Sequence, residues 1–294
     1  MNGNWQRLEE KISHLSGEKI RFKDRQTVTG GCINQCWKVS DSNNRQWFIK
    51  TNSVALLDMF IAESEGLEEI AASHSMRSPE ALCYGKTPEF SYLIMEYIPL
   101  VSFSNQAKGG EQLARMHRHT AGRFGWKRDN TIGSTPQPNE WHDDWVSFWK
   151  NRRLIHQLDL AKNKGYPARS YDAGVELAEN LSDFFSSHSV VPSLLHGDLW
   201  GGNIASDAQG EPVIYDPAVY YGDRETDLAL TELFGGFNAD FYAAYKQHYP
   251  LDQGYQSRKT LYNLYHILNH FNLMGGGYAS QAFQMTRQLL SEIR

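Results

Sequence analysis

The chain has 294 residues, which predicts two domains or lobes, because domains usually run to roughly 100–200 residues. Hydrophobic residues make up 40% of it and charged residues 21%, so it can bury a sizeable core and is not a disordered chain. Its 29 Lys and Arg against 34 Asp and Glu give a net charge of -5, which argues against a dedicated nucleic-acid binder. Aromatic residues reach 13%, and their use stays open, because both cores and sugar sites employ aromatic rings.

The cysteines and the first residues predict a cytoplasmic protein with no membrane segment. Three cysteines (Cys32, Cys36 and Cys83) are too few for a disulfide framework. The polar start MNGNWQRLEEKI does not resemble a signal peptide, and no run of about 18 apolar residues occurs. Cys32 and Cys36 could form half of a metal site, but no second Cys/His pair follows at zinc-like spacing.

The first 97 residues predict strands, one long helix and two further strands. Leu8, Ile12 and Leu15 recur at helical spacing, and runs rich in β-branched and aromatic residues follow between turn formers. The predicted elements are a helix at 5–16, a strand in IRFKDRQTV, strands at 36–40 and 46–51 joined by a turn at 41–44, a helix at 54–74, and strands at 81–84 and 92–97.

Beyond Pro99 the pattern becomes mainly helical. A loop-rich stretch covers 121–140, and one strand-rich island covers 194–216. We therefore expect an α+β fold with a small lobe at 1–97 and a larger, mainly helical lobe at 98–294. The helices predicted for the larger lobe are 106–120, 141–163, 173–187, 225–249, 257–273 and 279–293.

The island LLHGDLWGGNIASDAQGEPVIYDPA carries the strongest chemical signal. Asn203 follows Asp198 by five residues, and a hairpin then returns the chain to Asp216. Two carboxylates and an amide at the mouth of one hairpin suit Mg²⁺, which takes oxygen ligands and shares them with phosphates. Phosphoryl transfer by kinases needs this set: an Asp that receives the nucleophile's proton, an Asn and a second Asp for metal. The alternative is an Asx-rich surface hairpin.

The first lobe supplies matching parts. Lys50 ends an alternating strand, where kinases place a phosphate-binding lysine; alone it could equally be a solvated charge. Glu63 lies on the apolar face of the following helix and can pair with Lys50, whereas Glu65 is expected to point into solvent. Gly30 and Gly31 fall between the first two strands, where backbone N–H groups could approach phosphate oxygens.

A second possible phosphate-binding motif, at residues 85–87, is excluded. Gly85-Lys86-Thr87 has the ending of a phosphate-binding P-loop, but Glu80 stands where that motif needs glycine, and Pro88 follows at once. We therefore do not expect a P-loop nucleotidase.

These residues resemble the aminoglycoside phosphotransferase/choline kinase fold and, within it, the fructosamine (ketosamine) kinases. The HGDxxxxN pattern marks only the broader kinase-like fold, whereas the Trp after HGDL and the EWxDDW and YDPAxxYG patterns are more specific. The resemblance spans nearly the whole chain. Its segments are GGCI at 30–33, MFIAESEGL at 59–67, EWHDDW at 140–145, RLIHQLDL at 153–160, LLHGDLWGGN at 194–203, IYDPAVYYGDRETDLAL at 214–230, LFGGF at 233–237 and LNHFN at 268–272.

The resemblance implies a two-lobed, protein kinase-like fold and Mg²⁺- and ATP-dependent phosphorylation of a sugar hydroxyl on a ketosamine. A ketosamine is the adduct left when a sugar glycates an amine, on a small molecule or a protein, and its phosphorylation is associated with repair. Carried over, Asp198 is the base, Asn203 and Asp216 bind Mg²⁺, and Lys50, oriented by Glu63, holds phosphates. The ATP-binding positions it further implies are Gly30, Gly31, Cys32 and the hinge residues Met95, Glu96, Tyr97 and Ile98.

Several further residues could contribute to the site, and most of them also have a purely structural interpretation. Trp200 could pack on the sugar or fill the core. Asp143 and Asp144 could face a cationic amine or form a solvated helix start. His196 and Asp227 are expected to brace the loop that carries Asp198. Cys32 could be redox-sensitive or inert.

Three functions therefore stay open at this point: a ketosamine kinase, a related kinase for another hydroxyl acceptor such as an amino alcohol or an aminoglycoside, and a pseudokinase that binds nucleotide only. Pro217 after Asp216, with no A-P-E segment, favours a permanently competent small-substrate kinase over a switchable protein kinase. The preferred sugar and amine, and the oligomeric state, are not determined by the sequence.

Overall fold

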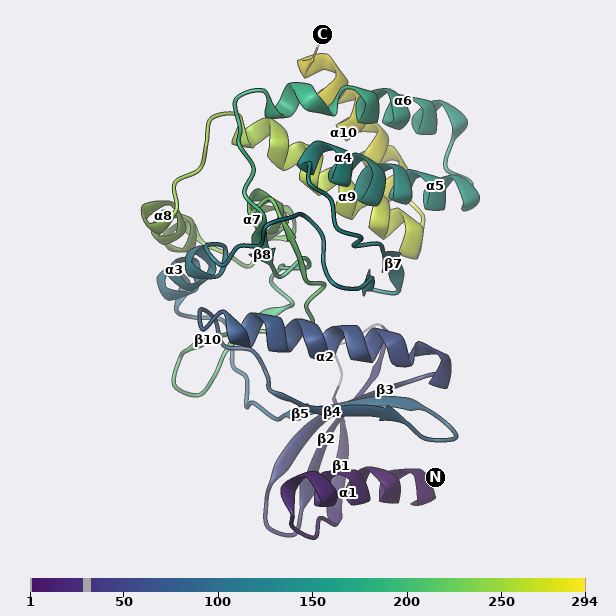
Figure 1. Cartoon of the computed structure of the whole chain (residues 1–294), viewed down its shortest axis with the longest axis vertical. Helices are drawn as coiled ribbons and strands as arrows, with labels where there is room; N and C mark the ends of the chain where they lie inside the picture. The colour runs from purple at the N-terminus through teal and green to yellow at the C-terminus, as the bar shows by residue number, and fades with distance from the viewer. Residues whose placement is uncertain (1, 29–32, 294) are drawn as a thin grey trace.

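The computed structural model describes residues 2–28 and 33–293, which form two lobes (Figure 1). The smaller lobe is built on a five-stranded antiparallel sheet in the order β1-β2-β3-β5-β4. Its elements are α1 (Asn2–Ser16), β1 (Phe22–Val28), β2 (Gln35–Asp41), β3 (Gln46–Asn52), a 3₁₀ turn (Val54–Leu56), α2 (Leu57–Ala72), β4 (Ala81–Lys86) and β5 (Ser91–Glu96).

The alternation of side chains along β3 and β5 explains why both faces of this sheet are covered. Ile49 and Ile94 point to one face, where α1 contributes Leu8 and Ile12. Their neighbours Phe48, Leu93 and Met95 pack on the other face with Phe60 and Leu67 of α2. Helix α2 therefore lies between the sheet and the larger lobe (Figure 1).

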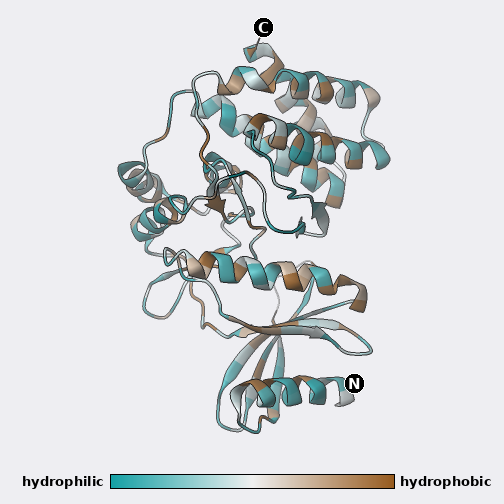
Figure 2. Ribbon diagram, in the orientation of Figure 1, coloured by the Kyte–Doolittle hydropathy of each residue, from teal (hydrophilic) through white to brown (hydrophobic). Residues whose placement is uncertain are grey.

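The larger lobe is mainly helical, and Figure 2 shows its helices with mixed hydrophobic and hydrophilic residues, as expected of helices with one buried face. Helix α3 packs on α8, and α9 packs against α5, α7 and α10. The helices are α3 (Gln106–Met116), α4 (Trp145–Trp149), a π-helical turn (Lys150–Leu154), α5 (Ile155–Asn163), α6 (Ala168–Glu179), a 3₁₀ turn (Leu181–Phe185), α7 (Glu225–Phe234), α8 (Ala239–His248), α9 (Tyr255–Met274) and α10 (Tyr278–Glu292).

Three short antiparallel pairs lie at the base of this lobe. The hairpin β9–β10 is the one expected within the island. The strand that pairs with β8 lies beyond the predicted island, and the pair within 121–140 was expected to be loop. The strands are β6 (Asn130–Ile132), β7 (Thr135–Gln137), β8 (Ser193–Leu195), β9 (Ile204–Ser206), β10 (Pro212–Ile214) and β11 (Tyr220–Gly222).

The α+β arrangement predicted from the sequence is confirmed; besides the unpredicted strands β6, β7 and β11, the errors concern helix boundaries. The helix expected over 225–249 is two helices, because Gly235 and Gly236 take positive φ values of 77° and 97°, which end α7. The helix expected from residue 141 begins at Trp145, since Asp144 caps it. The helix expected to reach residue 120 ends at Met116. Within the part of the chain that the structure describes, no helix is both long and apolar enough to span a membrane.

Candidate active site

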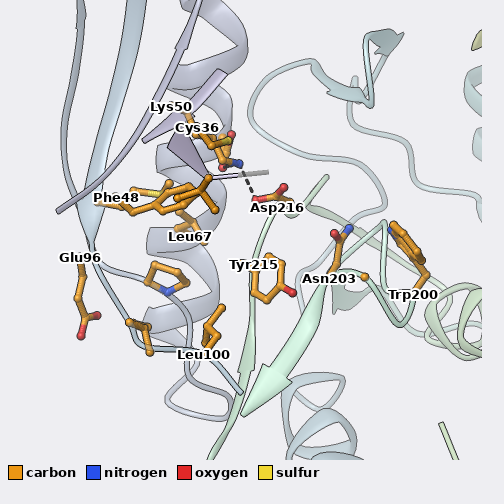
Figure 3. Close-up of a pocket in the computed structure, with 16 residues that line it drawn as sticks. Cys36, Phe48, Lys50, Leu67, Glu96, Leu100, Trp200, Asn203, Tyr215 and Asp216 are labelled. Carbon is orange, nitrogen blue, oxygen red and sulfur yellow. Dashed lines mark hydrogen bonds and ion pairs between the residues drawn. The ribbon is translucent and has the colours of Figure 1, made fainter. Parts of the chain in front are cut away.

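A cavity of about 310 Å³ lies between the sheet of the smaller lobe and the β9–β10 hairpin of the larger lobe (Figure 3). Its wall on one side is apolar, whereas charged and amide side chains gather at the other end. The lining residues are Val28, Cys36, Phe48, Lys50, Glu63, Leu67, Pro79, Met95, Glu96, Ile98, Leu100, Trp200, Gly202, Asn203, Tyr215 and Asp216.

Lys50 is the charged centre of the cavity. Its ammonium group lies 2.5 Å from a carboxylate oxygen of Glu63 and 2.5 Å from Oδ1 of Asp216 (Figure 3). Burial opposes the charge of Lys50, but the two carboxylates outweigh it and raise the pKa of Lys50 above its ordinary value. The lysine is therefore a permanent cation that joins β3, α2 and the strand end before Pro217.

Helix α2 is attached to the larger lobe through its second half, within two turns of Glu63. Glu69 accepts a hydrogen bond of 2.7 Å from the Tyr221 hydroxyl. A Cβ on Gly66 would lie 3.1 Å from the side chain of Val219, so the two lobes approach closely there. The expectation that Glu65 points into solvent is wrong: it pairs with Lys127 at 3.2 Å and with Arg128 at 3.3 Å.

Asp198 occupies the loop between β8 and β9 and has few hydrogen-bond partners. The side-chain amide of Asn203 donates to its backbone carbonyl at 2.8 Å and to its carboxylate at 3.2 Å. Burial, reinforced by the negative charge of Asp216, raises the pKa of Asp198 to about 7. The structure therefore brings together the three oxygen-bearing side chains that the sequence singled out, with a carboxylate poised to exchange a proton near neutral pH.

His196 joins the two strand ends that carry Asp198 and Asp216. Its Nε2–H donates to the carbonyl of Tyr215 at 3.0 Å, and its Nδ1 accepts from the backbone N–H of Asp198 at 3.2 Å. Burial lowers the pKa of His196, so the neutral ring keeps this donor and acceptor pattern at neutral pH.

Asp227, at the start of α7, holds the same loop from behind. Its carboxylate accepts from the backbone N–H groups of His196 at 2.8 Å and of Gly197 at 2.9 Å. Nε2 of His117 lies 3.2 Å from it, and Nδ1 of His117 lies 2.8 Å from the Tyr245 hydroxyl. Burial alone would raise the pKa of Asp227, but its bonds and attraction to His117 outweigh burial and lower it.

The connection between the lobes contributes the apolar end of the cavity. Met95, Glu96 and Ile98 line the cavity, whereas Tyr97 instead lies under the ammonium of Lys38, which sits 4.4 Å from the ring centroid. The predicted phosphate-loop residues lie outside the described residues; they are Gly30, Gly31 and Cys32.

The residues expected to meet the acceptor divide into two groups. Trp200 lines the cavity and is 41% exposed, so it is not a core residue. Asp143 and Asp144 are not among the lining residues: the first pairs with Arg123 at 2.7 Å on the surface, and the second caps α4 by accepting from Ser147 N–H at 2.7 Å.

Sequence reasoning missed several contributors. Arg77 pairs with Glu96 at the connection and with Asp207 of the larger lobe, and these partners lie 19 and 130 residues away in sequence, so no local signal exists. No role was predicted for His117, which directly follows α3 and is buried. A buried histidine on an apolar face requires a polar partner, and that signal could have directed attention to it.

The fold and the site together define a kinase-like phosphotransferase class: a lysine–glutamate pair on a sheet and helix, facing an Asp, Asn and Asp on a second lobe. A family model described as fructosamine kinase matches residues 4–292. A ketoamine kinase homologue from Synechocystis is 45% identical over 289 residues, covering 97% of each chain. The protein-ribulosamine 3-kinase of Arabidopsis thaliana is 42% identical over 272 residues, which cover 91% of this chain and 83% of the plant protein.

Solved structures agree with these matches. A fructosamine-3-kinase homologue from Haemophilus somnus superposes with a TM-score of 0.90 at 28% identity, covering 98% of each chain. Choline kinase from Streptococcus pneumoniae shares the fold, with a TM-score of 0.65 at 16% identity and 98% of each chain covered. The chain belongs to the fructosamine kinase family.

Proposed function

We propose that this protein transfers the γ-phosphoryl group of ATP to a sugar hydroxyl of ketosamines, the fructosamine or ribulosamine adducts of amines. The observation that carries the proposal is the placement of Lys50, Asn203 and Asp216 around one cavity, with the carboxylate of Asp198 hydrogen-bonded to Asn203 beside it. The names of the relatives support the acceptor class. Repair of glycated amines is the role that this activity would serve.

The apolar end of the cavity suits a planar nucleotide base. Val28, Phe48, Leu67 and Ile98 offer apolar surface there, and the backbone of the connecting segment 95–98 lies beside them. Lys50, a permanent cation held by Glu63, is then placed to hold the phosphates. The pair restrains the ammonium before ATP arrives, so little ordering remains for the binding step.

The acceptor hydroxyl is activated by Asp198. A carboxylate with a pKa of about 7 can accept a proton at neutral pH, and it binds that proton more strongly than an ordinary aspartate. His196 and Asp227 hold its loop through backbone bonds, so the carboxylate does not have to be ordered during the reaction. Trp200 offers an exposed indole for the sugar face.

The donor set beside Asp198 fits Mg²⁺. Asn203 uses its amide N–H toward Asp198, which leaves its carbonyl oxygen as a ligand, and Asp216 adds a carboxylate. Bound there, Mg²⁺ would neutralise phosphate charge. All these ligands are oxygen atoms, as this hard ion requires.

The attachment of α2 supports a kinase without an activation switch. Switchable kinases move this helix to make or break the lysine–glutamate pair. Here Glu65 and Glu69 join the helix to the larger lobe on both sides of Gly66. We infer that the enzyme is competent as folded.

The test is an acceptor panel. Purified protein with ATP should release ADP when fructosyl-lysine or ribulosyl-lysine is added, only with Mg²⁺ present, and NMR should locate the phosphate on a sugar hydroxyl. Much faster turnover of choline, an amino alcohol or an aminoglycoside would transfer the assignment to that class. Tight ATP binding with no transfer to any acceptor would instead support a nucleotide-binding pseudokinase.

A further inference from the structure

An aromatic surface leads out of the cavity, beginning at Trp200. The ring of Trp200 lies 6.4 Å from that of Phe234, Phe234 lies 5.0 Å from His270, and His270 lies 5.1 Å from Tyr278. Phe234 is 42% exposed, and Met274, one helical turn beyond His270 on α9, is 63% exposed. We call these five side chains the aromatic track.

The track is built from segments that are far apart in the sequence. Trp200 lies in the loop between β8 and β9 that also carries Asp198, Phe234 ends α7, and His270 lies on α9. These residues belong to the HGDLW, LFGGF and LNHFN segments through which the chain resembles its family. Neither LFGGF nor LNHFN has a role in the phosphoryl transfer described above. Phe237 packs on Phe241, and Asn272 bonds to Gln157, so parts of both segments serve the lobe's interior. The exposed ring of Phe234 has no such role and needs another explanation.

Glycines fix the geometry where the track meets the cavity. A Cβ on Gly236 would lie 2.8 Å from the Cα of Gly201, so the connection after α7 packs directly on the loop after Trp200. A Cβ on Gly202 would lie 2.3 Å from the indole of Trp200, which shows that this ring folds over the glycine backbone. The backbone thus holds the exposed rings of Trp200 and Phe234 next to one another.

We propose that the aromatic track binds the polypeptide that carries the ketosamine, contacting apolar side chains that flank a glycated lysine. This inference rests on the proposed function and deepens it, because it selects protein-bound over free ketosamine as the better substrate. The partner is an extended peptide segment with apolar residues beside the modified lysine.

Size and position favour this occupant. A cavity of about 310 Å³ is at the lower end of the volume for one small ligand, so the carrier of the amine must lie outside it. The track starts where the sugar would be held, at Trp200 (Figure 3), and runs outward, since Phe234, His270 and Tyr278 do not line the cavity. Five side chains are far fewer than the roughly 20–30 residues a side of a stable dimer interface.

The experiment compares two substrates with the same sugar: free fructosyl-lysine and a short peptide in which leucine or phenylalanine flanks fructosyl-lysine. The readout is the ratio of kcat/KM for the peptide to kcat/KM for the free adduct, in wild type, Phe234→Ser and Met274→Ser. Wild type should favour the peptide. Phe234→Ser should lower the ratio about tenfold, as truncation of an aromatic contact usually does, and Met274→Ser should lower it less.

Tyr84→Ser is the matched control, because Tyr84 is 39% exposed on β4 of the smaller lobe and should leave the ratio unchanged. The unglycated peptide should inhibit turnover of free fructosyl-lysine in wild type and about tenfold more weakly in Phe234→Ser. An equal ratio in all variants would overturn the inference, as would a dimer that Phe234→Ser dissociates without changing the ratio. If wild type phosphorylates neither substrate, the proposed function itself fails.

Discussion

The loop between β8 and β9 is flanked by two carboxylates, Asp198 and Asp227, which differ in their hydrogen-bond partners. On the buried side, Asp227 accepts two backbone N–H groups and contacts His117, and its pKa is lowered. On the open side, the carboxylate of Asp198 has Asn203 as its side-chain partner, and its pKa is raised to about 7. Two aspartate carboxylates that contact the same loop therefore have different environments.

This difference distinguishes a carboxylate that holds the loop in place from one that can take part in a reaction. A carboxylate that accepts several hydrogen bonds holds its surroundings in place and is stabilised as the anion, so it binds a proton only weakly. A carboxylate that is buried and incompletely partnered costs stability, and in return it binds protons near neutral pH. The comparison predicts opposite responses to the same Asp→Asn replacement at the two positions.

The largest expected effect is on turnover at the open side. Asp198→Asn should lower kcat by roughly 10²–10⁴-fold, about 3–5 kcal/mol in the activation barrier, because the acceptor hydroxyl loses its proposed base. Steady-state ADP release with a ketosamine measures it. Unchanged turnover would remove Asp198 from that role.

At the buried side the main loss should be in stability. Asp227→Asn should lower the free energy of unfolding by about 2–4 kcal/mol, because an amide cannot accept from all three donors and leaves buried polar groups unpaired. Urea denaturation at pH 7 measures this loss. A stable variant would show that the loop is held by other contacts.

Stability at the open side should change in the opposite direction. The folded pKa of Asp198 is above its ordinary value of 3.8, so the folded state binds the extra proton between about pH 4 and pH 7, and stability falls as pH rises through that window. Asp198→Asn removes this effect and should be about 1–3 kcal/mol more stable than wild type at pH 8. Urea midpoints at pH 4 and pH 8, without Mg²⁺, test the sign; a variant less stable at pH 8 contradicts it.

Bound Mg²⁺ should lower the pKa of Asp198. With Mg²⁺ at Asn203 and Asp216, the positive charge favours ionised Asp198, so the acid limb of the kcat/KM profile should shift about one pH unit lower between low and saturating free Mg²⁺. Rates at fixed ATP over pH 5–9 measure the shift. Asn203→Ala should reduce this shift. If the acid limb of the wild-type profile does not move with Mg²⁺, Asp198 is not close to the metal site.

The smallest effects test the two aspartates expected to meet the amine. Asp144→Ala should cost about 1 kcal/mol of stability through loss of a helix cap, and Asp143→Ala should cost less than about 0.5 kcal/mol as a surface ion pair. Neither should change KM for a ketosamine. A tenfold rise in KM in either variant, with stability as expected, would restore a substrate role.

Much of the site was predictable because its chemistry is local in sequence. Asp198 and Asn203 are five residues apart, and a short hairpin returns the chain to Asp216, so spacing alone predicts that they meet. The choice of Glu63 over Glu65 followed from helix periodicity, and the structure places Glu63 at Lys50. Predicted helix boundaries were wrong where backbone conformation decided them. At Gly235 and Gly236 the helix predicted over 225–249 is interrupted, and glycine permits such a break but does not require it.

The sequence by itself determined the α+β class and selected the residues proposed for phosphoryl transfer, because hydrophobic periodicity and motif spacing act over a few residues. Only the tertiary structure decided which carboxylates are satisfied and which are not, because partners such as His117 and Asp227 lie 110 residues apart. It also decided that the scattered Trp200, Phe234 and His270 form one surface. Burial and long-range hydrogen bonds set these properties, and neither can be read from neighbouring residues.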